Sequence, residues 1–587
     1  MHVLATAGHV DHGKSTLVRA LTGMEPDRWA EERRRGMTID LGFAWTTLPS
    51  GATVAFVDVP GHERFVPNML AGVGPVPAAL VVVAADEGWM PQSAEHLAAL
   101  DALDVRHGLL VVTRADLADP AAATELAQAE IAGTSLGAVP AVAVSAHTGD
   151  GIDELRAGLD RLIAGLPTPD EKAPVRLWID RAFTIRGSGT VVTGTLGAGR
   201  LHVGDELELD GADRPVRVRG LQSLGNTVSA IGAVARVAVN LRGVDRDSVG
   251  RGVALLTPGT FRRTDVVDVR VHGDPVADLA AWATLHVGSA AVPVHIRPLG
   301  PDTARLRLSS PLPLRIGDRA LLRDPGRHHV AGGVTVLDVV PPALRRRGAA
   351  AARAAELTTM DGVPDAAAEL RRRGLVRRAD LDRMGVGAGP EPVAGQWLAD
   401  PDHWTALQTR LADAVHAYAR EHPLDPGAPV EALRRSLDLP DRALVEALVR
   451  PPLVARAGRV AVGATAAGEM PPPVADAVRR LMADLKDRPF AAPEAYRLTE
   501  LGLGPKQIGA AVRAGALLRL ADAVVLPADA ADRATEVLAE LPQPFTLSEA
   551  RQALNTSRRV AVPLLELLDR TGRTRRLPDD RRTVDSG

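Results

Sequence analysis

Residues 8–15 read Gly-His-Val-Asp-His-Gly-Lys-Ser and match the phosphate-binding pattern G-x-x-x-x-G-K-[ST]. The match lies between an apolar run, Val3 to Ala7, and a helical stretch from Leu17 to Leu21. In this strand–loop–helix setting, backbone N–H groups surround a polyphosphate, the lysine spans the β- and γ-phosphates, and the hydroxyl binds Mg²⁺. The chain is therefore predicted to contain a nucleotide-binding α/β domain. The residues expected to form the loop are Gly8, His9, Val10, Asp11, His12, Gly13, Lys14, Ser15 and Thr16.

A second phosphate and metal element follows the loop. Val54 to Asp58 reads as a buried strand that ends in an acid, and Gly61 and His62 come directly after it. An aspartate at this place is expected on the Mg²⁺ side, and the glycine N–H can meet a γ-phosphate. Thr38 would complete the metal shell with Ser15 and Asp58. A glycine-rich turn before an ordinary helix is the alternative for the loop alone, and these further elements argue against it.

Two more strands predict a site for the base. The run 109–112 and the run 142–144 are both apolar, and polar residues follow each of them. Asp116 can accept from N1–H and the 2-amino group of guanine, which adenine lacks, and such a site discriminates by roughly 10⁴-fold. The Ala146 N–H would face the guanine O6. GTP is thus favoured over ATP. The base-site candidates are Thr113, Arg114, Asp116, Ser145, Ala146 and His147.

The segments GHVDHGKS, RGMTID and DVPGHE, with a Thr-x-x-Asp guanine motif, resemble the GTPase domain of translational elongation factors. The likeness is greatest to the bacterial selenocysteine-specific branch. The usual guanine motif is Asn-Lys-x-Asp, so Thr113 and Arg114 depart from it, although a threonine there is similar to the selenocysteine branch. The resemblance implies a ribosome-stimulated GTPase that binds GTP and Mg²⁺. In such an enzyme His62 orients the attacking water, and Val10 and Met37 form an apolar gate.

Length and composition limit the class of protein. A chain of 587 residues is long enough for roughly four domains. Cysteine is absent, which excludes disulfides and thiolate metal sites. No apolar stretch approaches the roughly 20 residues that a membrane span needs. The net charge is −3, so a nucleic-acid partner must meet a local basic patch. We expect a cytoplasmic monomer without a membrane partner.

The pattern of apolar runs and glycines along the chain predicts a multi-domain fold, with an α/β part first, a β part next and an α part last. Strands and helices alternate up to Leu166, and short β-branched runs broken by glycine then predict two antiparallel β-barrels. Recurring units of helix, turn, helix and hairpin, such as 432–462, predict an array of winged helices. The predicted domains are a GTPase domain (1–167), barrels at 173–259 and 260–342, and winged helices at 343–405, 406–468, 469–529 and 530–587.

The last of these units carries the candidate RNA-binding residues. Hydroxyls at the start of its second helix can donate to phosphates, and arginines lie at the start of that helix and on the hairpin, where a winged helix contacts nucleic acid. A solvated charged face is the alternative for such a cluster. The resemblance adds that this module binds the mRNA hairpin that marks a UGA codon for selenocysteine. The candidates are Thr556, Ser557, Arg558, Arg559, Arg573, Arg575 and Arg576.

The resemblance also implies a pocket for the aminoacyl end of the tRNA, formed in the first barrel by Asp180, Arg181 and Arg236. Guanidinium groups would favour an ionised selenol over the neutral hydroxyl of serine. An ordinary surface ion pair is the alternative. The predicted function is GTP-dependent delivery of selenocysteyl-tRNA to the ribosome at UGA codons.

Three other functions are weighed against this prediction. A general aminoacyl-tRNA carrier has no reason for the C-terminal array, and a GTPase coupled to a metabolic enzyme, such as the sulfate-activating type, lacks the winged-helix cycle. An RNA-binding translational regulator with a weakened GTPase is permitted by Thr113 and Arg114. The intact Lys14, Asp58, His62 and Asp116 oppose that third reading.

Overall fold

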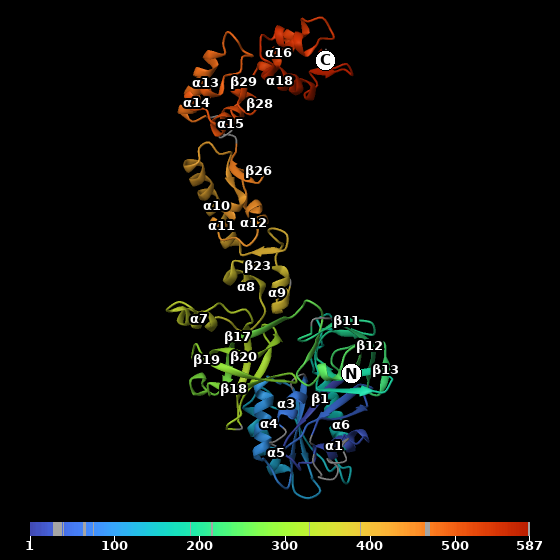
Figure 1. The fold of residues 1–587 in the computed structure, drawn as a ribbon. Helices are drawn as coiled ribbons and strands as arrows, with labels where there is room; N and C mark the ends of the chain where they lie inside the picture. The colour runs from blue at the N-terminus through green and yellow to red at the C-terminus, as the bar shows by residue number, and fades with distance from the viewer. Residues whose placement is uncertain are drawn as a thin grey trace. The chain divides into compact units, whose positions relative to one another are not determined.

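The computed structural model describes the chain except for residues 27–37, 39, 63–65, 74–75, 188, 213–214, 328, 388, 464–469 and 585–587. The chain divides into two compact units (Figure 1). The first contains residues 1–366 and 378–389, and the second contains residues 367–377 and 390–587. Within the described part of the chain, no helix is both long and apolar enough to cross a bilayer.

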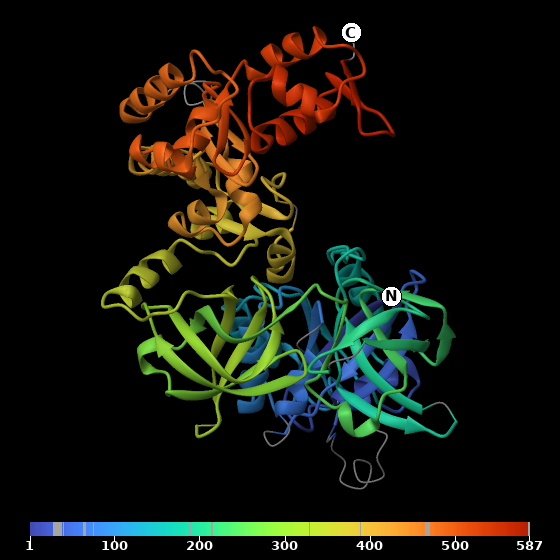
Figure 2. The same ribbon diagram turned by 45° about the horizontal axis from the view of Figure 1, so that its top comes forward.

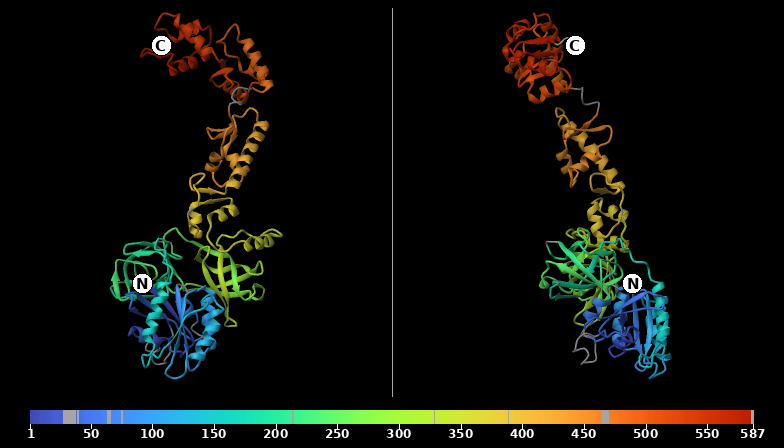
Figure 3. Two further views of the ribbon diagram at one scale, coloured as in Figure 1. Left: turned by 180° about the vertical axis from the view of Figure 1, so that it is seen from behind. Right: turned by 90° about the vertical axis from the view of Figure 1, so that its right-hand side faces the viewer.

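The first domain is the predicted α/β domain. Among the described residues, six strands form its sheet in the order β2-β3-β1-β4-β5-β6, and only β2 runs antiparallel to its neighbour. Helices cover both faces of this sheet (Figure 3). The strands are β1 (His2–Ala7), β2 (Gly42–Thr47), β3 (Thr53–Asp58), β4 (Ala78–Ala84), β5 (Gly108–Thr113) and β6 (Ala141–Ala143). The helices are α1 (Lys14–Thr22), α3 (Val66–Val73), α4 (Pro91–Ala102), α5 (Ala121–Ala132) and α6 (Ile152–Ala164).

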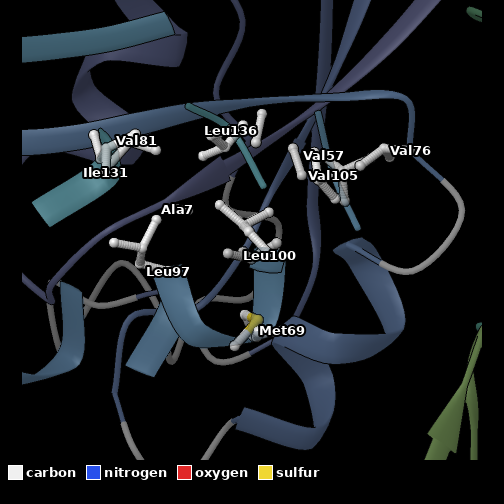
Figure 4. Close-up of a cluster of buried hydrophobic side chains, with 14 of the residues drawn as sticks. Ala7, Val57, Met69, Val76, Val81, Leu97, Leu100, Val105, Ile131 and Leu136 are labelled. Carbon is white, nitrogen blue, oxygen red and sulfur yellow. The ribbon is translucent and has the colours of Figure 1, made fainter. Parts of the chain in front are cut away.

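Two hydrophobic cores hold this sheet between its helices. In β4, Val81 and Val83 enter one core while Leu80 and Val82 enter the other, because successive side chains of a strand point to opposite faces. Both faces are buried, which is why the strands are apolar throughout. Figure 4 shows the core on the α3, α4 and α5 side, where Leu97 of α4 packs among strand residues. This packing fixes α4 beside the loop that follows β1.

The first β domain is antiparallel and surrounds a single core. Its main sheet has the order β7-β16-β11-β12-β15-β9-β8, β13 pairs with β12, and β10 pairs with β14. Buried and less buried residues alternate along β15, as expected for strands with one face inward. The strands are β7 (Arg176–Trp178), β8 (Arg181–Ile185), β9 (Gly189–Leu196), β10 (Arg200–His202), β11 (Glu206–Leu209), β12 (Pro215–Ser223), β13 (Asn226–Val228), β14 (Ala230–Gly232), β15 (Ala235–Arg242) and β16 (Ala254–Leu256). The 3-10 helix η2 (Arg246–Ser248) precedes β16.

The second β domain is a closed barrel, drawn in light green in Figure 2. Its six described strands follow the order β17-β20-β19-β18-β21-β22, and β22 pairs back with β17. The strands are β17 (Arg262–Gly273), β18 (Trp282–Val287), β19 (Ala290–Pro298), β20 (Thr303–Leu314), β21 (Arg319–Asp324) and β22 (His329–Asp338). The 3-10 helix η3 (Val276–Asp278) follows β17. Helix α7 (Ala349–Thr358) follows the barrel in the chain and packs against β20.

The C-terminal part repeats one order of elements. Three described cycles each place three helices before a hairpin, which confirms the predicted winged-helix array. The first cycle has α10 (Pro401–Glu421), α11 (Val430–Ser436), α12 (Arg442–Leu448), β26 (Leu453–Arg456) and β27 (Arg459–Val462), with β25 (Ala428–Pro429) beside β27. The second has α13 (Pro472–Asp484), α14 (Ala495–Glu500), α15 (Pro505–Arg513), β28 (Leu517–Ala521) and β29 (Val524–Pro527). The third has α16 (Ala530–Ala539), α17 (Leu547–Ala553), α18 (Arg558–Arg570), β30 (Thr574–Arg576) and β31 (Arg582–Val584).

A shorter set of elements precedes these cycles: α8 (Ala366–Arg373), β23 (Leu375–Arg377), α9 (Arg378–Met384) and β24 (Trp397–Ala399). Helix α10 runs without a break through the boundary expected between residues 405 and 406. That boundary therefore falls inside an element, and we propose that the second winged helix begins near Pro401. The other domain boundaries remain predictions.

Candidate functional sites

The phosphate-binding loop is closed around its own lysine. Helix α1 begins at Lys14, directly after Gly13. The Lys14 Nζ donates to the carbonyl oxygens of Gly8 at 2.9 Å and His9 at 2.6 Å. Burial lowers the pKa of Lys14 to about 8. The ammonium group thus lies inside the curve of the loop, where a polyphosphate would meet it.

Two side chains of α4 hold the same loop from outside. The Gly8 N–H donates to His96 Nδ1 at 2.9 Å, and the Val10 N–H donates to Gln92 Oε1 at 3.0 Å. Burial lowers the pKa of His96 to about 3, so its ring stays neutral and keeps an acceptor nitrogen. Gly8 has a φ of +143°, and a Cβ there would lie 2.2 Å from the Val82 carbonyl oxygen. These braces lie more than 80 residues from the loop, and the motif gives no sign of them.

The three predicted metal ligands lie together: Ser15 is at the start of α1, Asp58 is at the end of β3, and Thr38 lies beside Ser15. The Ser15 hydroxyl donates to Asp58 Oδ2 at 2.7 Å and is 2.9 Å from the Thr38 hydroxyl. Thr6 donates to the other Asp58 oxygen at 2.8 Å. Asp58 is fully buried, and this burial raises the pKa of its carboxyl group. Two hydroxyls and a carboxylate are the oxygen ligands that Mg²⁺ prefers, so the set fits that ion.

Gly61 approaches the loop more closely than any other residue type allows. A Cβ at this position would lie 2.5 Å from the Val10 nitrogen and 2.6 Å from Lys14 Nζ. The next residue, His62, is half-buried beside this contact. Met37, expected with Val10 in an apolar gate, lies outside the described residues.

The residues of the guanine motif have different surroundings. Thr113 is buried, and its hydroxyl donates to the His12 carbonyl at 2.8 Å, so it supports the phosphate loop. Arg114 pairs with Asp86 at 2.9 Å and Glu87 at 2.8 Å. A hydrogen bond from Ser145 lowers the pKa of Asp116, which keeps that carboxylate ionised. The segment that contains Ala146 and His147 follows β6 at the same edge of the sheet.

The three residues proposed for the aminoacyl pocket lie where the first β domain meets the GTPase domain. Arg236 binds both carboxylate oxygens of Asp180, at 2.7 Å for one of them, and the Thr193 hydroxyl donates to the same carboxylate at 2.7 Å. Arg236 and Arg181 both lie over the Phe43 ring, 3.8 and 5.1 Å from its centroid. Two guanidinium groups thus lie over one aromatic ring. The arrangement therefore contains two cation–π contacts in addition to the Asp180–Arg236 ion pair.

The candidate RNA-binding residues have three kinds of surroundings. Some fasten the last winged helix to the one before it: the Thr556 hydroxyl donates to the Phe490 carbonyl at 2.5 Å, and Arg559 donates to the Pro493 carbonyl at 3.0 Å. Others face solvent, namely Ser557, Arg558, Arg575 and Arg576. Arg573 pairs with Asp532 at 2.6 Å.

A cavity of about 360 Å³ lies in the last winged helix. Arg558, at the start of α18, contributes to its wall. Arg551 of α17 also lines the cavity, and it is not among the predicted RNA-binding residues. Because Arg551 comes three residues after Ser548, the two side chains share one face of the helix, and this spacing can be read from the sequence. The lining residues are Thr546, Leu547, Ser548, Arg551, Arg558, Asp579, Asp580 and Arg581.

Comparisons with sequence families agree with this arrangement. The elongation factor Tu GTP binding domain matches residues 1–165. The β-barrel domain of selenocysteine-specific elongation factor matches residues 265–343, and the winged helix of elongation factor SelB matches residues 536–583.

Individual relatives and structures point the same way. The selenocysteine-specific elongation factor of Escherichia coli (strain K12) is 37% identical over 470 residues, which are 76% of this chain and 75% of that protein. That of Desulfomicrobium baculatum is 37% identical over 361 residues, 59% of this chain and 57% of that protein. The crystal structure of a bacterial selenocysteine-specific elongation factor, EF-Sec, covers 100% of both chains with a TM-score of 0.78 and 26% identity.

An archaeal structure matches a shorter part. Elongation factor SelB from Methanococcus maripaludis, in complex with the GTP analogue GPPNHP, covers 58% of this chain and 79% of its own, with a TM-score of 0.51 and 25% identity. The E. coli relative, the three family matches and the full-length structural match together show the family of this chain. The chain belongs to the selenocysteine-specific elongation factors and is a GTP-dependent translational GTPase.

Proposed function

We propose that this elongation factor carries selenocysteyl-tRNA to the ribosome at UGA codons marked by an mRNA hairpin, working as a monomer in the cytoplasm. The observation that carries the proposal is the presence, in one chain, of a GTPase site and a terminal winged helix with an arginine-lined cavity. A general tRNA carrier has no use for the second feature. The names of the relatives support the selenocysteine assignment.

For GTP hydrolysis we assign roles to residues of the first domain. Lys14 and the loop N–H groups bind the phosphates, and Asp116 reads the guanine edge. Ser15, Thr38 and Asp58 would hold Mg²⁺, which neutralises charge on the β- and γ-phosphate oxygens. His62 orients the attacking water, because it follows the glycine that approaches Lys14. Thr113 acts indirectly, since its hydroxyl supports the loop at the His12 carbonyl.

For the choice of amino acid we assign Asp180, Arg181 and Arg236. The Arg236 guanidinium is fixed by Asp180 and Thr193, so it costs little entropy to present its charge. An ionised selenol would gain from two nearby guanidinium groups, whereas the serine hydroxyl is neutral and gains less.

For RNA recognition we assign the cavity of the last winged helix. Arginine side chains stack on bases and bind phosphates, and carboxylates accept from base amino groups. The cavity contains both kinds of group. Arg551 and Arg558 come from α17 and α18, and Asp579 and Asp580 come from the turn between β30 and β31. Such a lining suits an unpaired loop base better than a helical stem, whose deep major groove side chains cannot reach.

The test uses the full chain and a fluorescent stem-loop from a selenoprotein message. Fluorescence anisotropy should show an affinity that falls as salt rises, because arginines displace counterions from phosphates. Arg558→Ala and Arg551→Ala should each weaken binding roughly 5- to 150-fold, the cost of about 1–3 kcal/mol for a lost base contact.

The matched control is Arg533→Ala, which removes an exposed arginine of α16 that lies outside the cavity and pairs with Asp529. It should bind the stem-loop like wild type. Equal affinity of the wild-type protein for the stem-loop and a scrambled RNA would contradict hairpin recognition by this factor.

A further inference from the structure

Arg251 contacts three separate segments with one guanidinium group. It lies in the turn between η2 and β16, in the first β domain. Its Nε donates to the Asp180 carbonyl at 3.2 Å, one terminal nitrogen pairs with Asp40 at 2.8 Å, and the other donates to the Asn68 side chain. The side chain is 30% exposed, so most of its surface is enclosed by these partners.

Asp40 binds a second arginine of the same β domain. Its Oδ1 meets Arg251 and its Oδ2 lies 2.9 Å from Arg181, so one carboxylate joins two guanidinium groups. Arg181 also donates to the Leu41 carbonyl. The position of Arg181 is therefore set by the segment 40–41 of the GTPase domain.

Both GTPase segments that Arg251 and Arg181 contact follow residues of the nucleotide site. Asp40 comes two residues after Thr38, whose hydroxyl lies 2.9 Å from that of Ser15. Asn68 is in α3, shortly after Gly61 and His62. A change at the γ-phosphate that moved either segment would have to move or break the contacts of Arg251.

We propose that Asp40 and Arg251 are positioning residues that link the nucleotide state to the aminoacyl pocket. The inference rests on the proposed function of Asp180, Arg181 and Arg236. With GTP bound, Thr38 stays at the metal site. Asp40 then holds Arg181 beside Phe43, and the Asp40 carboxylate neutralises the charge of the Arg181 guanidinium. After hydrolysis Thr38 is released, Asp40 withdraws, and Arg181 loses the partner that orders it.

The physical basis is preorganisation. A side chain that is already fixed binds its ligand without paying the entropy of ordering, and a mobile arginine does not have this advantage. Asp40 also neutralises part of the positive charge around Phe43, so it keeps Arg181 and Arg236 close together. Asp40 and Arg251 should then account for part of the difference in aminoacyl affinity between the GTP and GDP states, and a coupling of this kind corresponds to roughly 5- to 150-fold.

The experiment measures the dissociation constant of labelled selenocysteyl-tRNA with the full chain, once with GPPNHP and once with GDP. Asp40→Asn and Arg251→Met should each reduce the ratio of the two constants, by about tenfold. Arg251→Lys should restore part of the ratio, because an ammonium keeps the charge but lacks the planar fork that reaches three acceptors. The double variant Asp40→Asn/Arg251→Met should lose little more than either single variant.

The control is Arg200→Met, which removes another arginine of the same β domain, one that pairs with Glu171, between α6 and β7. Its ratio should match that of wild type. Nucleotide affinity, measured in parallel, should be unchanged in Asp40→Asn and Arg251→Met, which separates coupling from damage to the GTP site.

The outcomes are distinct. Equal loss of tRNA affinity in both nucleotide states would make Arg251 a structural residue only and overturn the inference, as would an unchanged ratio. If Arg251→Met fails to fold, Asp40→Asn decides, since an amide replaces the carboxylate at equal size. A wild-type protein that binds seryl-tRNA as tightly as selenocysteyl-tRNA would contradict the proposed pocket itself, whatever the variants do.

Discussion

Single side chains from distant parts of the chain complete the nucleotide site. Thr113 stands where related GTPases have an asparagine, and its hydroxyl meets the His12 carbonyl. His96 and Gln92 accept two N–H groups of the same loop. The loop is thus preorganised by side chains whose own positions depend on α4 and β5. Preorganised donors at a phosphate stabilise the transition state without further ordering.

The first residue-scale prediction concerns His62. His62→Ala should leave GTP affinity within about twofold of wild type but abolish most ribosome-stimulated hydrolysis, because the proposed role exists only in the transition state. Nucleotide titration and single-turnover hydrolysis with and without ribosomes would separate the two effects. A stimulated rate equal to wild type would remove His62 from the mechanism.

The second concerns pH and His286 of β18. Burial lowers the pKa of this histidine to about 4, with a further contribution from Arg323, whereas the unfolded chain has a value near 6.5. Between these pH values the unfolded chain binds more protons. The free energy of unfolding should therefore fall as the pH drops from about 6.5 to 4. His286 alone should contribute about 3 kcal/mol to this fall.

Thermal unfolding of the first unit, followed from pH 7 to 4.5, checks this sign. His286→Gln cannot be protonated, so its midpoint should fall less steeply over that range. His12 and His96 are lowered in the same direction and keep part of the slope in both proteins. Identical slopes in the variant and the wild type would show that His286 is not protonated on unfolding in this range.

At the scale of elements, α7 is held to the barrel by a buried ionic cluster. Arg353 of α7 pairs with Asp268 at 2.7 Å and Asp338 at 2.6 Å, and Arg305 binds the same Asp268 at 2.7 Å. Arg353, Asp268 and Asp338 are all nearly inaccessible to water. Two buried carboxylates require a cation between them, so α7 cannot leave the barrel without exposing or stranding charge.

Arg353→Met should therefore destabilise the first unit by about 3–5 kcal/mol, the cost of leaving buried charge unpaired. Hydrogen exchange should speed up in α7 and in the neighbouring strand β22. Arg347→Met, at an exposed position just before α7, is the control and should exchange like wild type. Unchanged protection of α7 in Arg353→Met would mean that apolar packing alone holds the helix.

At the scale of the whole molecule, the last two winged helices share a hydrophobic core, so we expect their stabilities to be coupled. Phe490 and Leu526 of the third share a core with Phe545 and Leu564 of the fourth. The Thr556 and Arg559 contacts join the same pair. The third winged helix also has a core of its own, and so does the winged helix of α10 to α12. A fragment that starts at Ala530 would expose the shared core on one side.

Two truncations test this organisation. Removal of residues 530–587 should abolish hairpin binding and also lower the unfolding midpoint of the third winged helix, because Leu526 and Phe490 lose their cover. Removal of 470–587 should abolish hairpin binding while leaving GTP affinity and the remaining transitions unchanged. The contrary result, a third winged helix that is equally stable without the fourth, would show that the shared core adds no stability.

The sequence by itself determined the fold class and the family, and it predicted which residues form the phosphate-binding loop. A phosphate loop is a local structure, so glycine, lysine and serine at fixed spacing are enough to predict it, and the alternation of apolar runs predicts the layers around it. Only the tertiary structure decided that Gln92 and His96 brace the loop, that Arg251 reaches Asp40, and that Arg551 lines the cavity of the last winged helix. These contacts join residues that are far apart in the chain or on separate elements. Their existence depends on how α4, the first β domain and α17 pack, and no local pattern encodes that packing.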